Sequence, residues 1–175
     1  DGGTGGGYIS SASLSDDGGF IYVGGLRNYN TDTHKWNSYI YKFDTKKNKK
    51  IWERKNLTFS EPHSMIAYDD GVYFSSHKVF KKRHMLFLSK VDTKGNLLWK
   101  KEIEIDNNDS GFQTSLSKDK EGNLSLITAE RLYNDELQPI FKAHRITRDG
   151  SVELSKIVDM ELEKGVLLSK LKHLS

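Results

Sequence analysis

The segment VDTKGNLLWK, residues 91–100, is the clearest indication of the fold class. It contains a polar turn followed by a short apolar strand that ends near a tryptophan. The turn Asp92–Asn96 contains Asp, Gly and Asn, which accept the backbone conformations of tight hairpins. The stretch before it, residues 86–91, alternates apolar and polar side chains as a half-buried strand does. Another turn, Tyr68–Gly71, precedes the apolar run Val72–Phe74. The pattern in residues 68–100 therefore predicts antiparallel strands joined by short turns.

The same order of turns and strands occurs three times. Gly19, Gly71 and Gly122 are 52 and 51 positions apart, and each precedes an apolar run. Trp52 and Trp99 end the first two copies, and Leu154 stands at the matching place in the third. Self-similarity at a period of about fifty residues is typical of a repeat protein.

Each copy is expected to contain four strands. The expected strands are residues 9–14, 20–23, 39–43 and 51–54; 65–68, 72–74, 86–91 and 97–100; and 112–116, 124–127, 141–146 and 152–154. Runs of four to six β-branched and aromatic residues, broken by turn residues, do not fit helices. The pattern predicts an all-β, β-propeller-like fold of about three four-stranded antiparallel blades. Because propellers have about 4 to 8 blades, the ring is incomplete, and the remainder of a longer chain or another copy is expected to complete it.

This organisation divides the chain into five parts. They are a Gly-rich tail (1–7), blade 1 (8–58), blade 2 (59–106), blade 3 (107–160), and a partial fourth unit or C-terminal extension (161–175). The tail lacks apolar side chains and has neither a preceding strand nor a following helix, so it is not a phosphate-binding loop. In the last part, Val166–Leu168 fits either a strand or one face of a helix, and the strand follows from the repeat.

Composition narrows the function classes. The chain of 175 residues has 35% hydrophobic residues, a net charge of +3 and no cysteine. Disulfides and thiolate chemistry are therefore excluded. Nucleic-acid binding is not expected, because it requires clustered basic charge. No membrane span is expected, because the longest apolar runs are far below the ~20 residues that cross a bilayer.

The segment DGGFI, residues 17–21, and the hairpin that ends at Trp99 resemble the repeats of bacterial PQQ-like propeller proteins. They are similar also to the Asp-Gly-Gly-aromatic-Ile repeats of surface proteins in Bacteroidetes-type bacteria. The resemblance covers residues 8 to about 160 and implies that Trp52 and Trp99 dock between adjacent blades. Gly24-Gly25 resembles a kelch blade, but Ser75-Ser76 stand at the matching place, so kelch is the weaker match. The resemblance also implies export to the periplasm, the cell surface or the medium.

No catalytic residue, metal site or cofactor is expected. The acidic pairs fall in turns, where Asp stabilises the local backbone. The six histidines have neither helical i, i+4 spacing nor strand alternation. No Gly-x-Ser-x-Gly turn is present to expose a serine nucleophile.

A candidate binding face lies in the connections between second and third strands. In a propeller these connections emerge on one face of every blade, so residues 26–38, 77–84 and 130–139 are expected to converge. The candidate residues are Arg27, Tyr29, His34, Trp36, His77, Lys81, Lys82, Arg83, His84, Arg131 and Tyr133. Arg, Tyr and Trp are enriched at binding hot spots, and basic residues favour an acidic partner such as an anionic glycan or an acidic protein patch.

The sequence thus leads to two functional hypotheses. The first is a non-catalytic interaction or ligand-binding propeller segment of an exported bacterial protein. The alternative is part of a propeller enzyme whose catalytic residues lie outside this chain.

Overall fold

The computed structural model describes residues 6–30, 35–55, 61–80, 83–105, 112–119, 121–131 and 139–158. These residues form three separate four-stranded antiparallel sheets. The first sheet contains β1 (Tyr8–Leu14), β2 (Phe20–Asn30), β3 (Lys35–Asp44) and β4 (Lys49–Lys55). The second, or middle, sheet contains β5 (Pro62–Tyr68), β6 (Gly71–Phe80), β7 (Arg83–Asp92) and β8 (Leu97–Ile103). The third contains β9 (Phe112–Lys118), β10 (Leu124–Arg131), β11 (Pro139–Ile146) and β12 (Val152–Val158).

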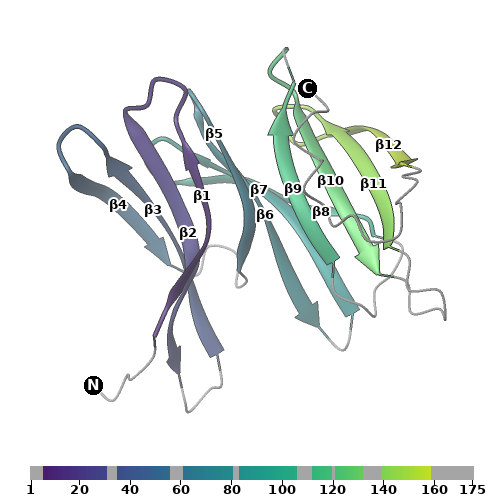
Figure 1. Cartoon of the computed structure of the whole chain (residues 1–175), viewed down its shortest axis with the longest axis horizontal. Coiled ribbons are helices and arrows are strands. Elements are labelled where there is room, and N and C mark those ends of the chain that lie inside the picture. Colours follow the sequence, from purple (N-terminus) through teal and green to yellow (C-terminus); the bar gives the residue numbers. More distant parts are fainter. Residues whose placement is uncertain are drawn as a thin grey trace, which may run out of the picture.

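The three sheets fan outward from their first strands. Within each sheet the strands pair in chain order, and β5 contacts both β1 and β9 while the later strands lie farther out (Figure 1). The prediction of an all-β fold with three four-stranded antiparallel units is confirmed. The expected unit at residues 161–175 and the tail at 1–5 lie outside the described residues.

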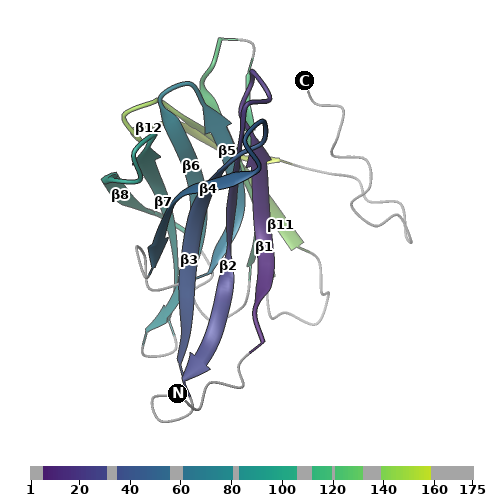
Figure 2. The same ribbon diagram turned by 90° about the vertical axis from the view of Figure 1, so that its left-hand side faces the viewer.

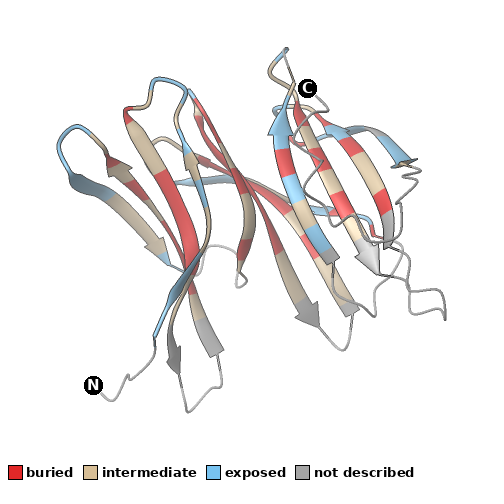
Figure 3. Ribbon diagram, in the orientation of Figure 1, coloured by how far each residue is buried: buried red, intermediate tan, exposed pale blue. Residues whose placement is uncertain are grey.

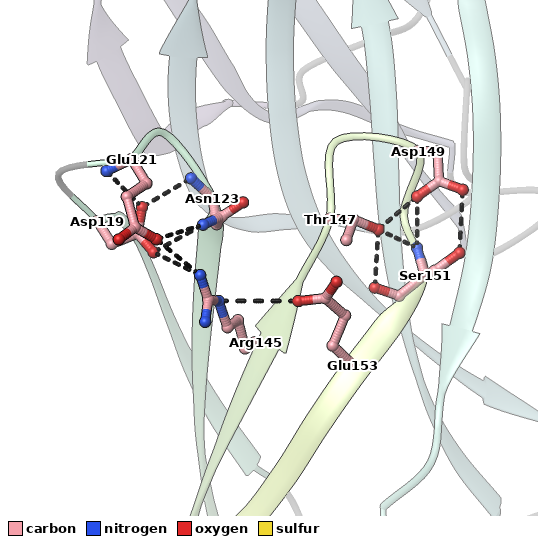
Figure 4. A network of polar contacts seen from close by, with 8 residues as sticks. All are labelled: Asp119, Glu121, Asn123, Arg145, Thr147, Asp149, Ser151 and Glu153. Atoms are coloured by element: carbon pink, nitrogen blue, oxygen red, sulfur yellow. Dashed lines mark hydrogen bonds and ion pairs between the residues drawn. The ribbon is translucent and has the colours of Figure 1, made fainter.

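Aspartates build the turns at the edge that joins third and fourth strands. Asp92 Oδ1 accepts the main-chain N–H groups of Lys94 and Asn96, at 2.9 and 2.8 Å. Asp149 accepts hydrogen bonds from Thr147 and Ser151, which lower the pKa of its carboxyl to about 2 (Figure 4). Each carboxylate satisfies N–H groups that the turn leaves without a ladder partner.

Two hydrophobic clusters fill the spaces between the sheets. The first joins Tyr22 and Ile40 of the first sheet to Val72 and Phe74 of the middle sheet. The second joins Tyr73, Leu86 and Leu88 of the middle sheet to Leu124, Leu126 and Ile146 of the third. Because side chains alternate along a strand, β6 sends Val72 and Phe74 to one neighbour and Tyr73 to the other. The middle sheet is therefore buried on both faces (Figure 3).

Register defines which positions are equivalent in the three units. Tyr22, Lys42 and Trp52 are directly paired across β2, β3 and β4. Tyr73, Lys90 and Trp99 form the same row in the middle sheet, and Ser125, Arg145 and Leu154 form it in the third. Along the strand, Gly71 lies one position closer to this row than Gly19 and Gly122 do, because the β5–β6 hairpin pairs Tyr68 directly with Gly71. The three glycines are thus not strictly equivalent.

Each tryptophan lies against a glycine in the next sheet. The Trp52 ring packs beside Tyr22, with centroids 6.0 Å apart, and its Nε1 donates to the Thr93 carbonyl at 2.8 Å. A Cβ on Gly95 would lie 2.9 Å from the Trp52 ring, and a Cβ on Gly150 would lie 2.8 Å from the Trp99 ring. Both tryptophans are partly buried rather than largely buried, because their rings lie at the outer margin of the clusters. We call this contact the tryptophan–glycine contact.

Serine side chains join the first strands. Ser13 Oγ accepts the Ala67 N–H at 2.9 Å, and Ser64 Oγ accepts the Leu116 N–H at 2.9 Å. Facing main-chain groups of β5 and β9 thereby gain hydrogen-bond partners, although neighbouring first strands form no ladder with each other.

Candidate functional site

The connections between second and third strands lie at one edge of all three sheets, which we call the loop edge. The ends of β2, β6 and β10 meet this edge, and the turns that join β3 to β4, β7 to β8 and β11 to β12 lie at the opposite edge (Figure 1). The hairpins are longer than expected, since pairing continues to Asn30↔Lys35 and Phe80↔Arg83. Most of the residues 26–38 and 77–84 therefore lie in strands and not in loops.

Arg27 is engaged within the first sheet. Its guanidinium forms an ion pair with Glu53 and lies 5.3 Å from the centroid of the Tyr39 ring. Lys50 also reaches Glu53, at 2.6 Å. Burial opposes ionisation of Glu53, but Lys50 and Arg27 hold the pKa of its carboxyl below the usual range. Arg27 therefore stabilises the β2–β3–β4 end of the sheet, where it shares the Glu53 carboxylate with Lys50.

Three histidines gather on the middle sheet near the loop edge. His77 Nε2 and His84 Nδ1 are 2.8 Å apart, and their rings are nearly parallel with centroids separated by 4.9 Å. His63 lies on the other side of His77, with ring centroids 5.6 Å apart. We call His63, His77 and His84 the histidine cluster.

A bulge in β5 contributes His63 to this cluster. Pro62 pairs with Ser76 and Ser64 pairs with Ser75, so His63 is the extra residue between them. An extra residue of this kind changes the direction in which a side chain leaves the strand. The sequence expectation included His77 and His84 but not His63, because the spacing 63–77–84 contains no metal or strand pattern. Only cross-strand register brings the three side chains together.

Burial keeps the central imidazole neutral. Burial first, and then the neighbouring His63 and His84, lower the pKa of His77 to about 4. Burial also lowers the pKa of His63, whose Nε2 is buried without a hydrogen-bond partner. In the part of the chain that the structure describes, no group of three or more His, Asp and Glu side chains is arranged to hold a metal ion. The histidine cluster therefore offers hydrogen-bonding nitrogens, and its His63 and His77 rings resist protonation because of their burial.

The structure describes only some of the remaining candidate residues. Tyr29, Trp36, Arg83 and Arg131 belong to strands β2, β3, β7 and β10, whose ends form the loop edge. His34, Lys81, Lys82 and Tyr133 lie outside the described residues. By sequence, Lys81 and Lys82 stand between Phe80, the last residue of β6, and Arg83, the first residue of β7, which pair with each other.

A cavity that was not expected from the sequence lies between the middle and third sheets. A cavity of about 260 Å³ is lined by Glu104, Lys142, His144, Ser155, Lys156 and Ile157. His144 is 3% exposed, and its Nδ1 lies 2.8 Å from Ser155 Oγ. Burial first, and then the charge of Lys142, lower the pKa of His144. No motif marks this cavity, because its residues come from β11, β12 and the residue that follows β8.

Comparison with known proteins identifies the fold and no family. No family model matches the chain, and no curated protein matches it. A cryo-EM structure of TcdA4 from Morganella morganii is similar, with a TM-score of 0.55 and 14% sequence identity. The match covers 84% of this chain but 7% of the TcdA4 chain. Among the described residues, no helix is long and apolar enough to cross a membrane.

Proposed function

We propose that this chain is a non-catalytic binding segment of a β-propeller in an exported bacterial protein. The observation that carries the proposal is the loop edge: the ends of β2, β6 and β10 lie along it, the β6–β7 pair carries His77 and His84 of the histidine cluster, and the sequence puts Lys81–Arg83 between Phe80 and His84. The contacts between β1, β5 and β9 support the propeller, because the first strands of blades surround a common axis. Export rests on the resemblance to bacterial surface repeats.

The proposed partner carries negative charge, as an anionic glycan or an acidic protein patch does. A basic hairpin tip attracts such a partner through solvent, and neutral rings beside it supply contact area at little entropic cost. Arg27 contributes less to this attraction, because its guanidinium is held in an ion pair with Glu53. The charge contribution therefore comes mainly from the middle hairpin.

The test is a glycan array followed by titration of a binding glycan at several salt concentrations. Charge reversal of Lys81, Lys82 and Arg83 to Glu should lower affinity by about tenfold or more and remove most of its salt dependence. Reversal of Lys46, Lys47 and Lys49 to Glu, at the opposite edge, is the matched control; with a monovalent glycan in solution, where the number of chains per assembly does not alter the affinity per chain, it should change affinity less than about twofold. Equal losses in both variants would show that only net charge matters and would refute the loop edge as the site.

A further inference from the structure

The two outer faces of the array differ from the faces buried inside it. The outer face of the first sheet is turned away from the middle sheet and stands in front in Figure 2. It retains the apolar positions that the other sheets bury: Ile21 and Phe43 match Val72 and Val91, which are 0% exposed. Ile21 and Phe43 stay partly exposed, and Ile9 and Leu14 are 60% and 55% exposed. The outer face of the first sheet is therefore apolar in the way that the buried faces are, but no sheet of this chain covers it.

The outer face of the third sheet is its counterpart, and it has lost both large rings of the repeat. Ser125 stands where Tyr22 and Tyr73 stand in the other units, and Leu154 stands in the place of Trp52 and Trp99. A sheet that receives this face needs no glycine to admit an indole ring.

The first sheet lacks that glycine. Its β3–β4 turn has Asn48 at the positive-φ position, with φ of 50°, where the other two turns have Gly95 and Gly150. Since a Cβ on Gly95 would lie 2.9 Å from the Trp52 ring, a tryptophan cannot sit on Asn48 in the same way. Both halves of the tryptophan–glycine contact are thus absent, one from each outer face, and the two faces suit each other.

Charge at the turns agrees with this match. Inside the chain, Asp69 in the β5–β6 turn lies 3.7 Å from Arg148 in the β11–β12 turn of the next sheet. The equivalent turn of the third sheet carries Asp119 and Glu121, which with Glu153 surround Arg145 and leave a net negative cluster (Figure 4). The receiving β3–β4 turn of the first sheet carries the basic run 46–50. Continuing the same junction places acidic groups opposite basic ones.

We propose that a second copy of this chain packs the outer face of its first sheet against the outer face of the third sheet. Two such head-to-tail junctions join two chains into one closed ring of six sheets. A head-to-tail interface forms a ring when its rotation closes, and six blades fall within the range of about 4 to 8 that propellers use. The interface uses the flanks of the array and leaves the loop edge free, so it is independent of the proposed binding function.

Sedimentation velocity of the full chain tests this assembly. The 20.0 kDa chain should sediment as a dimer of about 40 kDa at micromolar concentration. Replacing Ile9 and Leu14 with Glu should raise the dimer dissociation constant by about a hundredfold, because each charge would be buried in the junction. Leu98→Glu is the matched control: Leu98 is 53% exposed on the outermost strand of the middle sheet, and its substitution should leave the dimer intact.

A charge exchange sharpens the test. Lys46→Glu with Lys47→Glu should weaken the dimer by about tenfold, and adding Glu121→Lys with Glu153→Lys should restore it, because attraction is re-formed with reversed signs. Circular dichroism confirms that each variant is folded. A monomer at about 100 µM, or a dimer that Ile9→Glu with Leu14→Glu does not weaken, would overturn the proposal and leave neighbouring protein sequence or another partner as the occupant of the face.

Discussion

The two junctions between sheets share their apolar contacts and differ in their polar ones. At the junction of the first and middle sheets, Trp52 donates to Thr93 and the Arg54 guanidinium reaches the carbonyl of Gly95 at 2.9 Å. At the junction of the middle and third sheets, Tyr73 donates to the Arg148 carbonyl at 3.2 Å, and Ser75 lies 2.6 Å from Thr114. The tryptophan–glycine contact and the serine bonds between first strands occur in both. The repeat therefore maintains ring packing and inner-strand bonding, while the polar contacts around them vary.

Removing the tryptophans should have the largest effect on the two junctions. Trp52→Ala or Trp99→Ala should lower the free energy of unfolding by about 3 kcal/mol, at the low end of the range for large aromatic residues, because both rings are only partly buried. Trp52→Phe should lower the free energy of unfolding by about 1 kcal/mol more than Trp99→Phe does, because it also removes the hydrogen bond to Thr93. Urea unfolding measures both values. A change below about 1 kcal/mol for both alanine variants would show that the rings do not hold the sheets together.

Adding a methyl group under the rings should have a smaller effect. Gly95 and Gly150 have φ of 87° and 84°, so Ala at either place adds backbone strain of roughly 1 kcal/mol and also contacts the indole. Gly18 has φ of 66° but nothing within 4 Å of a Cβ, so Gly18→Ala isolates the strain alone. We expect Gly95→Ala and Gly150→Ala to cost about 2 kcal/mol, and Gly18→Ala about 1. Equal costs at the three positions in thermal or urea melts would argue against tight ring packing.

Mild acid, at about pH 6, should have the smallest effect, and it should act mainly through His77 in the middle sheet. The pKa of His77 falls from 6.5 in the unfolded chain to about 4 in the fold, so the unfolded chain binds more protons between these values. Stability should therefore be fully present above pH 6.5 and decline as the pH falls toward 4. His77→Asn should flatten this dependence in urea midpoints measured from pH 7 to pH 4. An unchanged slope would assign the acid sensitivity to His63 or His144 instead.

Strand order could be predicted from the sequence, because local patterns determine it. The turn at Asp92–Asn96 and the row that ends in Trp52, Trp99 and Leu154 specify four strands per unit without knowledge of the contacts. Strand length could not be predicted at the loop edge. Residues such as Tyr29 and Trp36 read equally well as loop or strand, and only pairing across the long hairpins decides between them.

The histidine cluster could not be predicted from the sequence for a related reason. His63, His77 and His84 become neighbours through the pairing of β5, β6 and β7, and the bulge at His63 depends on that pairing. A bulge has no reliable local signature, so residues 14 and 21 positions apart give no sign of proximity. The shifted position of Gly71 has the same origin, since the length of a hairpin turn changes the alignment by one residue.

The serine bonds between first strands have a consequence for the history of the repeat. Ser13 and Ser64 accept main-chain N–H groups, and Trp52 and Arg54 donate to main-chain carbonyls. In each contact one partner is a main-chain group, which is present whichever side chain the partner residue has. Mutation on the receiving side can then accumulate without breaking the junction. Copies joined in this way can diverge in sequence while they keep the same packing.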